Sequence, residues 1–345
     1  MRYSLLSRFQ GVLLGAALGE ELGFYYWRQQ LQRKPLPGEY SAVRERVDLF
    51  AWRPGSEGEE STQSQPIPSI WGRIALCLTE ALVLKGGWHG LNLEQMALSV
   101  LTDDTGTIST TSPGVMGVDL AIATLPIALF FHDNEFKRQQ ALEEVASQLK
   151  AKPGAWEEAW TLSVAIAAAL KEQLSPRHLI PDLVTHLQSG GFSQNDVLKN
   201  FIAKLEQTQT LLQEGTDLGT ARAKLLSSQK SGLSSEVICL ALYCGLSTPE
   251  DFRLALIRAA RFCGVVQVCG LTGALMGAYN SRVGIPLVWR IANAYHSVYR
   301  GWGVSGAKIE QLATRLLAVW SGVYNPVGCP EQIPAIAAPG VIRLP

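Results

Sequence analysis

The stretch that decides the fold runs from Asp251 to Trp289 and reads DFRLALIRAARFCGVVQVCGLTGALMGAYNSRVGIPLVW. Its first part, residues 252–260, places apolar side chains at helical spacing with arginines on the other face, which predicts an amphipathic helix. Between Phe262 and Ser281 the only ionisable groups are thiols and one phenol, and small residues recur three and four positions apart. Such a helix packs closely against neighbours on all sides. We therefore expect residues 262–281 to form the central helix of an α-helical protein.

The composition limits the size and the class of the protein. The chain has 345 residues, enough for one large or two ordinary domains with a sizeable core. Hydrophobic residues make up 47% and charged residues only 17%, so most helices must be well buried. The 30 basic and 30 acidic residues cancel, which gives no sign of a polyanionic partner. We expect no binding of nucleic acid.

The apolar segments favour neither export nor a membrane span. Arg8 and Gln10 interrupt the N-terminal apolar run, and Glu20 and Glu21 follow where a signal peptide would have small cleavage-site residues. Residues 262–281 approach the length of a membrane span, but their polar residues and repeated glycines favour a buried helix of a soluble protein. None of the six cysteines forms a CxxC pair, which predicts buried, reduced thiols. We predict a cytoplasmic protein without a transmembrane segment.

The central stretch also carries a resemblance to a known family. GLTGALMGAY, followed by IPLVW, resembles the last block of the ADP-ribosylglycohydrolase family, all-α hydrolases that remove ADP-ribose from proteins using two magnesium ions. In that family the block begins Gly-Gly-Asp-Thr-Asp-Thr, and the aspartates hold the metals. Here the same six positions, 262–267, read FCGVVQ. Gly264 and Val266 therefore stand in place of the two aspartates, and Gln267 follows them.

The N-terminal segment resembles the opening block of the same family. Residues 8–23, RFQGVLLGAALGEELG, match its pattern Arg-Phe-x-Gly-x-Leu-x-Gly-x-Ala-x-Gly-Asp-x-x-Gly, except that Glu20 replaces the aspartate. The resemblance implies that Glu20 is a carboxylate lining the site. The alternative is a polar residue at a helix end.

The second block of the family has lost its carboxylates here. In active relatives a Thr-Asp-Asp-Thr run stands directly before the helix that is predicted here at residues 74–82. The equivalent positions are Ser69, Ile70, Trp71 and Gly72. We expect the Trp71 indole to fill the former cleft by packing towards residues 264–266.

A Thr-Asp-Asp-Thr run does occur at residues 102–105, but its context differs. The following residues, GTISTTSPG, read as a loop, and the expected helix lies about 30 residues earlier. We interpret Asp103 and Asp104 as capping or turn residues. Because adjacent carboxylates suit a hard cation, the alternative is a relocated metal site.

The middle block of the family corresponds to residues 112–131. Ile122 and Ala123 replace its polar site residues, although Asp119 lies one turn earlier and remains a candidate. The segment 27–68 is rich in charges, proline and glycine, which predicts a surface loop. Residues 176–230 contain helical pieces in which no site is indicated.

These observations predict an all-α fold. We expect one compact ADP-ribosylglycohydrolase-like helical domain over residues 1–325, followed by a proline-rich tail at 326–345. The four blocks occur in the order that the family has them.

The function does not follow from the fold. Because the positions that would hold magnesium have lost their carboxylates, we predict a noncatalytic protein without a metal cofactor that acts as a regulatory, binding or assembly partner of another protein. Two alternatives remain: a protein that binds ADP-ribose or a related nucleotide without turnover, and an ADP-ribosyl hydrolase with a relocated metal site.

Overall fold

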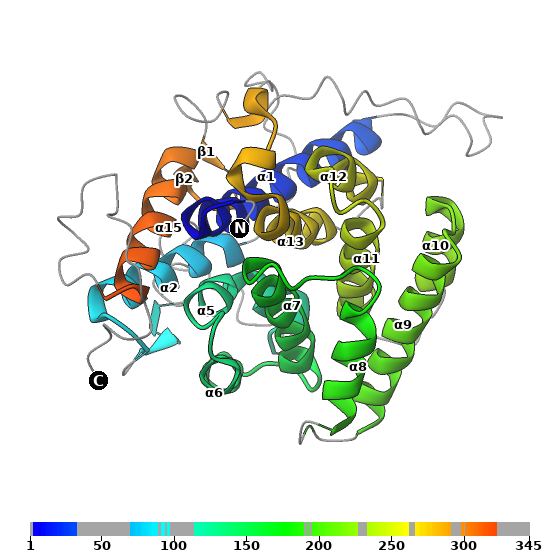
Figure 1. Cartoon of the computed structure of the whole chain (residues 1–345), viewed down its shortest axis with the longest axis horizontal. Coiled ribbons are helices and arrows are strands. Elements are labelled where there is room, and N and C mark those ends of the chain that lie inside the picture. Colours follow the sequence, from blue (N-terminus) through cyan, green and yellow to red (C-terminus); the bar gives the residue numbers. More distant parts are fainter. Residues whose placement is uncertain are drawn as a thin grey trace.

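A computed structural model of the chain describes residues 3–32, 70–88, 91–93, 95–96, 114–189, 192, 195–226, 233–261, 266–290, 298–299 and 301–322. In these residues the regular structure is helical, apart from a two-stranded antiparallel sheet and one isolated bridge between Val115 and Ala151. The predicted all-α fold is confirmed. The helices and strands, labelled as in Figure 1, are α1 (Leu5–Gln32), α2 (Trp71–Lys85), α4 (Gly117–Ala123), α5 (Leu125–Phe130), α6 (Glu135–Gln148), α7 (Ala155–Leu170), α8 (Leu179–Ser189), α9 (Asp196–Gln213), α10 (Leu218–Leu225), α11 (Leu233–Ser247), α12 (Phe252–Ala260), α13 (Val266–Gly284), β1 (Val298–Tyr299), β2 (Val304–Ser305) and α15 (Gly306–Trp320).

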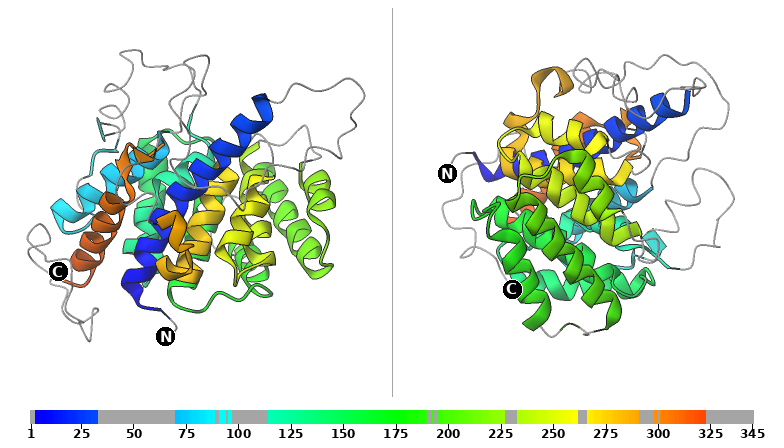
Figure 2. Two further views of the ribbon diagram at one scale, coloured as in Figure 1. Left: turned by 90° about the horizontal axis from the view of Figure 1, so that it is seen from above. Right: turned by 90° about the vertical axis from the view of Figure 1, so that its right-hand side faces the viewer.

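Helices α1 and α13 lie side by side at the centre of the molecule (Figures 1 and 2). On its other sides α13 contacts α12, α11, α7 and α4. This arrangement confirms the central position expected from the apolar, small-residue pattern of the stretch. The outer helices form the rest of the globule: α15 packs against α1 and α2, and α9 packs between α8 and α11.

Glycines allow the two central backbones to approach closely. A Cβ atom on Gly15 would overlap the carbonyl oxygen of Gly273, and a Cβ on Gly273 would overlap that of Gly15. The same relation holds between Gly11 and Gly277, one helical turn away. No residue with a side chain fits at these four positions, because backbone atoms cannot move aside as a flexible side chain can. The small-residue spacing in the sequence is thus the contact surface of the α1–α13 pair.

A buried arginine holds one end of this pair. The Arg8 guanidinium is 4% exposed, and its Nη1 atom donates hydrogen bonds to the carbonyl oxygens of Ala169 (2.8 Å) and Ala278 (2.9 Å). Its Nη2 atom pairs with Glu172 at 2.7 Å. A buried charge is tolerated when it is paired and hydrogen-bonded, as it is here. Arg8 therefore ties α1 to α13 and to the end of α7.

The structure changes several expected boundaries. Helix α1 continues to Gln32, so residues 27–32 are helical rather than part of the predicted surface loop. The end of α13 is kinked at Ser281, which has a φ of 59°. The last helix begins at Gly306, and a hairpin of β1 and β2 precedes it. Residues 33–69 and the tail at 326–345 lie outside the described residues. Among the helices of the described part, none is both long and apolar enough to cross a membrane.

The close approach of α1 and α13 predicts an unequal response to glycine substitutions. Gly15→Ala should lower the free energy of unfolding by about 3 kcal/mol or more, because the added methyl group meets a backbone carbonyl. Gly245→Ala in α11 is the matched control, since its methyl group would meet chiefly the flexible end of Met276. That change should cost less than about 1 kcal/mol, helped by the higher helix propensity of alanine. Urea unfolding followed by circular dichroism measures both, and equal losses would contradict the packing described here.

Candidate functional site

Glu20 lies in the middle of α1, with its side chain buried against α13. The residue is 4% exposed, and α1 continues for three further turns, so Glu20 is not at a helix end. A Cβ atom on Gly270 would lie 2.8 Å from Cγ of Glu20. The space for the carboxyl group therefore exists because α13 has a glycine at this level.

An indole from the hairpin closes this space. Trp302 follows β1 in the turn that leads to β2, and only 1% of its surface is exposed. Its Nε1–H donates a hydrogen bond of 2.8 Å to Oε2 of Glu20. The ring lies on the first turn of α2, where a Cβ on Gly72 would be 2.6 Å from the indole nitrogen. Trp302 thus fills the space between Glu20 on α1 and the start of α2.

Trp302 has no sequence pattern that marks it as a site residue. The residue is flanked by Gly301 and Gly303 between short apolar segments, which is a turn signal and no more. Gly303 has a φ of 69°, and its N–H donates to the carbonyl oxygen of Tyr299 at 2.7 Å. This left-handed glycine closes the hairpin and sets the indole against α2. Its partner Glu20 is 282 positions away, so no local pattern could have found the contact.

Burial keeps Glu20 protonated. It raises the pKa of the Glu20 carboxyl to about 8, and the Trp302 hydrogen bond offsets this only in part. The negative charges of Asp119 and Glu21 raise it further. Among the described residues the other oxygen, Oε1, is buried without a hydrogen-bond partner. At neutral pH this group is therefore mainly a neutral carboxylic acid.

Asp119 lies close enough to Glu20 to act on its pKa. Desolvation raises the pKa of Asp119 to about 6, and the positive charge of Lys152 partly lowers it. Asp119 is in the first turn of α4. The start of this helix is held by α11, because the Val118 N–H donates to Ser234 Oγ at 2.8 Å. Ser234 in turn donates to the buried Glu158, which lies over Gly117. The structure therefore brings the two candidate carboxyl groups of the first and middle blocks together.

The structure describes some of the other residues that the sequence predicts at the site. Val266 begins α13 one turn from Gly270 and packs on Gly23, the glycine one turn beyond Glu20 on α1. Gln267 follows it and is half-buried. Ile70 is the N-cap of α2 without a side-chain cap bond, and Trp71 is half-buried against the core. Ser69, Gly264, Asp103 and Asp104 lie outside the described residues, so the packing of Trp71 on residues 264–265 stays a prediction.

The four sequence blocks thus converge on Glu20 in the structure. The sequence pattern of the ADP-ribosylglycohydrolase family matches residues 1–326 of the chain. The chain belongs to the ADP-ribosylglycohydrolase family. Among solved structures it is similar to a chain described as "ADP-ribosylglycohydrolase-related protein complex", with 20% sequence identity, a TM-score of 0.53, and coverage of 91% of this chain and 97% of that one. At this identity the likeness concerns the fold. No curated protein matches the sequence.

The side chains described at this family site do not fit a magnesium pair. Hard cations bind several oxygen ligands, including carboxylates. Ile70, Trp71 and Val266 offer no side-chain oxygen, and Glu20 is largely protonated with one oxygen engaged by Trp302. Within the described part of the chain, no three His, Cys, Asp or Glu side chains gather as a metal site. The donor set of the described residues is therefore poor in the anionic oxygens that this chemistry needs.

The raised pKa of Glu20 predicts a pH-dependent stability. The folded chain holds a proton at a pKa of about 8 that the unfolded chain releases near its ordinary value of 4.5. The stabilisation is complete below the unfolded value and is lost as the pH rises through the folded one. The pKa of Asp119 is raised to about 6, so its deprotonation adds to the loss of stability as the pH rises towards 6.

Glu20→Gln is the variant that tests this dependence. The amide keeps an oxygen for the Trp302 indole but does not titrate. Between about pH 5 and pH 8, the unfolding free energy of the wild type should fall relative to the variant by up to about 1.4 kcal/mol per pH unit. Urea unfolding at several pH values measures the difference. Parallel pH profiles for the two proteins would contradict a buried, protonated Glu20.

Proposed function

We propose that this chain is a noncatalytic member of the ADP-ribosylglycohydrolase family that acts as a regulatory or assembly partner of another protein. The observation that carries the proposal is the Trp302 indole, which is hydrogen-bonded to Glu20 and lies on Gly72. It occupies the space between the first and second blocks of the family site. An indole at that place supports the N–H bond to Glu20 and offers no acceptor for a cation.

The small number of carboxyl groups at the described site also supports a loss of metal chemistry. Two-metal hydrolysis requires several carboxylates converging on one small volume. Val266 and Trp71, which stand at former ligand positions, leave Glu20 and Asp119 as the carboxyl groups of the described site.

An exposed apolar surface beyond α13 favours a protein as the partner. Val283, Leu287 and Val288 are 60%, 58% and 48% exposed and follow one another closely in the chain. Val298 on β1 is 58% exposed. Apolar side chains grouped in this way are typical of surfaces that another protein covers.

A noncatalytic site predicts the absence of magnesium-dependent turnover. Incubated with Mg²⁺ and an ADP-ribosylated protein, the chain should release no ADP-ribose above the rate without protein, while an active relative tested in parallel does. Calorimetric titration with Mg²⁺ should give no saturable binding below about 1 mM, because the described site lacks anionic oxygens. Mg²⁺-dependent release that Glu20→Gln abolishes would establish a hydrolase with a relocated metal site. Saturable binding of ADP-ribose without release would favour the nucleotide-binding alternative.

The partner hypothesis predicts that a charge on the exposed apolar surface weakens assembly. The affinity-tagged chain, purified from its native cells, should retain a protein that is lost with Leu287→Asp. Leu84→Asp is the control, because Leu84 is even more exposed, at 74%, but lies on α2. Neither change should alter the melting temperature by more than a few degrees, since both side chains are largely in solvent. If the two variants retain the protein equally, either the interface does not include Leu287 or the chain does not act as a partner of another protein.

A further inference from the structure

A cleft of about 900 Å³ lies on the side of the molecule formed by α8 to α12. Its walls are the turn before α8, the end of α9, the turn into α10, and one face each of α11 and α12. No lining residue comes from α1, α2 or α13, so the cleft is separate from the Glu20 site. A volume of this size suits a small-molecule ligand.

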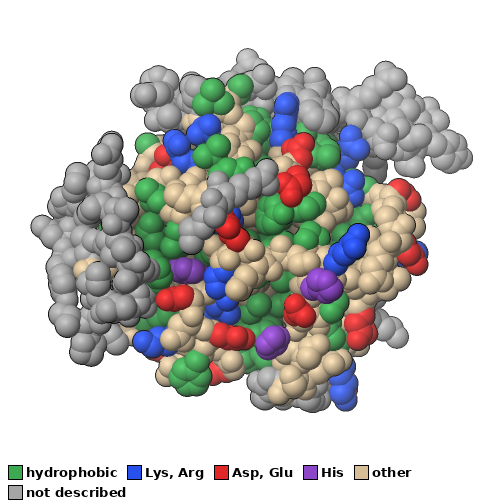
Figure 3. Space-filling view, viewed as in Figure 1, with side chains coloured by type: hydrophobic (Ala, Val, Ile, Leu, Met, Phe, Trp, Pro, Cys, Tyr) green, Lys and Arg blue, Asp and Glu red, His purple; other side chains and the backbone are tan. Residues whose placement is uncertain are grey.

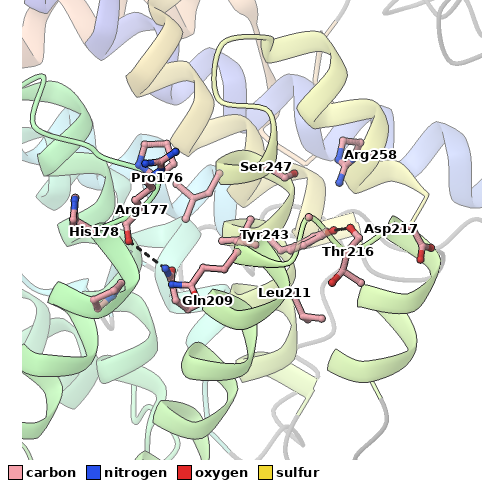
Figure 4. A pocket seen from close by; sticks show the side chains of 15 residues that line it. Pro176, Arg177, His178, Gln209, Leu211, Thr216, Asp217, Tyr243, Ser247 and Arg258 are labelled. Carbon is pink, nitrogen blue, oxygen red and sulfur yellow. Dashed lines mark hydrogen bonds between the residues drawn. The ribbon is translucent and has the colours of Figure 1, made fainter.

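Two arginines stand on opposite sides of the cleft. Figure 4 shows Arg177 and His178 on one side, Arg258 on the other, and Tyr243 and Gln209 between them. In the space-filling view, acidic, basic and histidine side chains are interspersed on the surface over this side of the molecule (Figure 3). Within the described part of the chain, no carboxylate forms an ion pair with either arginine. Two arginines therefore line the cleft against one carboxylate, that of Asp217.

The acidic group at the rim is already engaged. Asp217 is the N-cap of α10, and its Oδ1 accepts hydrogen bonds from the N–H groups of Gly219 (2.9 Å) and Thr220 (3.0 Å). Hydrogen bonds from Thr220 hold the pKa of Asp217 below its ordinary value. The Asp217 carboxylate thus caps the N-terminus of α10 and does not pair with the arginines.

Two buried polar atoms in the cleft have no partner among the described residues. They are Nε of Arg258 and Oε1 of Gln209. The amide of Gln209 is held on its other side, because Nε2 donates to the carbonyl oxygen of Arg177 at 3.2 Å. A buried donor or acceptor left unsatisfied is costly, and a bound ligand can supply the missing partner. Both residues line the cleft, although these two atoms themselves have almost no accessible surface.

Tyr243 gives the cleft a rigid wall. Its hydroxyl donates to the carbonyl oxygen of Thr216 at 2.5 Å, and the Arg258 guanidinium lies over its ring at 5.7 Å from the centroid. Burial raises the pKa of Tyr243, so the phenol stays protonated and keeps this bond. Stacking on the ring holds the guanidinium plane in place before any ligand binds.

We propose that this cleft binds a small organic phosphate. Guanidinium groups recognise phosphate with paired, charge-assisted hydrogen bonds, and Arg258 and Arg177 supply two of them. Pro176, Pro181 and Leu246 offer apolar surface for the organic part of the ligand. This binding does not depend on the function proposed for the Glu20 site.

Calorimetry with three probes tests the chemistry. AMP carries a phosphate, an organic body and hydrogen-bond donors, adenosine lacks the phosphate, and inorganic phosphate lacks the body. AMP should bind saturably below about 1 mM, inorganic phosphate more weakly, and adenosine not measurably. Binding of adenosine as tight as that of AMP would overturn the proposal, and so would the absence of saturable AMP binding.

Matched variants test the place. Arg258→Gln should weaken AMP binding at least about tenfold, and Arg177→Gln, in the exposed turn before α8, should weaken it in the same direction. Arg253→Gln is the control on the same helix, because Arg253 also lies over an aromatic ring, that of Trp289, but outside the cleft. Glu20→Gln is the control for the family site. Both controls should bind AMP as the wild type does, and all four variants should keep the wild-type far-ultraviolet circular dichroism spectrum.

The pattern across the variants decides between the two sites. If Arg177→Gln and Arg258→Gln both bind AMP as tightly as the wild type, the cleft is not the site and the proposal fails. If Glu20→Gln abolishes AMP binding, the ligand occupies the family site, and the proposal for the cleft fails as well.

Discussion

The contact between the backbones of α1 and α13 is the constraint on which the rest of the structure depends. At Gly15 and Gly273, the carbonyl oxygen of one helix lies where the Cβ atom of a larger residue on the other helix would be. This restricts the rotation of the two helices about their axes, because the glycine faces must meet. Helices α4, α7, α11 and α12 pack on α13, and α15 packs on α1.

The same register decides the environment of the candidate site. One turn beyond the glycine contacts, α13 presents Gly270 to Glu20, and the carboxyl group enters the space that a larger residue would fill. Trp302 then covers it from the hairpin, which removes water and raises the pKa of the acid. The fold of a metal-dependent hydrolase family is thereby compatible with a site whose central carboxyl group is neutral. Fold and chemistry are separable because the contacts of Gly15 with Gly273 and of Gly11 with Gly277 do not involve the ligand positions.

The cleft between α8 and α12 illustrates a second consequence of a helical scaffold. Arg177 and Arg258 line it and form no ion pair with a carboxylate of the described residues, whereas the buried Arg8 and Glu158 are engaged by several partners. The two sites share no lining residue, so one chain has room for two independent interactions.

The sequence by itself determined the all-α class, the central position of the small-residue helix and the family. It also predicts that Trp71 and Val266 stand at positions where the family has aspartate. These properties follow from local periodicity and from residue identity, which need no tertiary information. The sequence was less accurate about where helices end. Residues 27–32 continue α1, although their composition predicts a surface loop.

Only the tertiary structure decided how the site is filled and where the cleft lies. Trp302 reaches Glu20 across 282 positions, and Arg177 meets Arg258 at one cleft although 81 positions separate them in the chain. A side chain in a glycine-flanked turn or on a polar helix face gives the same local pattern whether it faces solvent or a distant carboxyl group. The packing of whole helices selects between these two environments. That packing is set by the α1–α13 contact and not by the sequence neighbours of either residue.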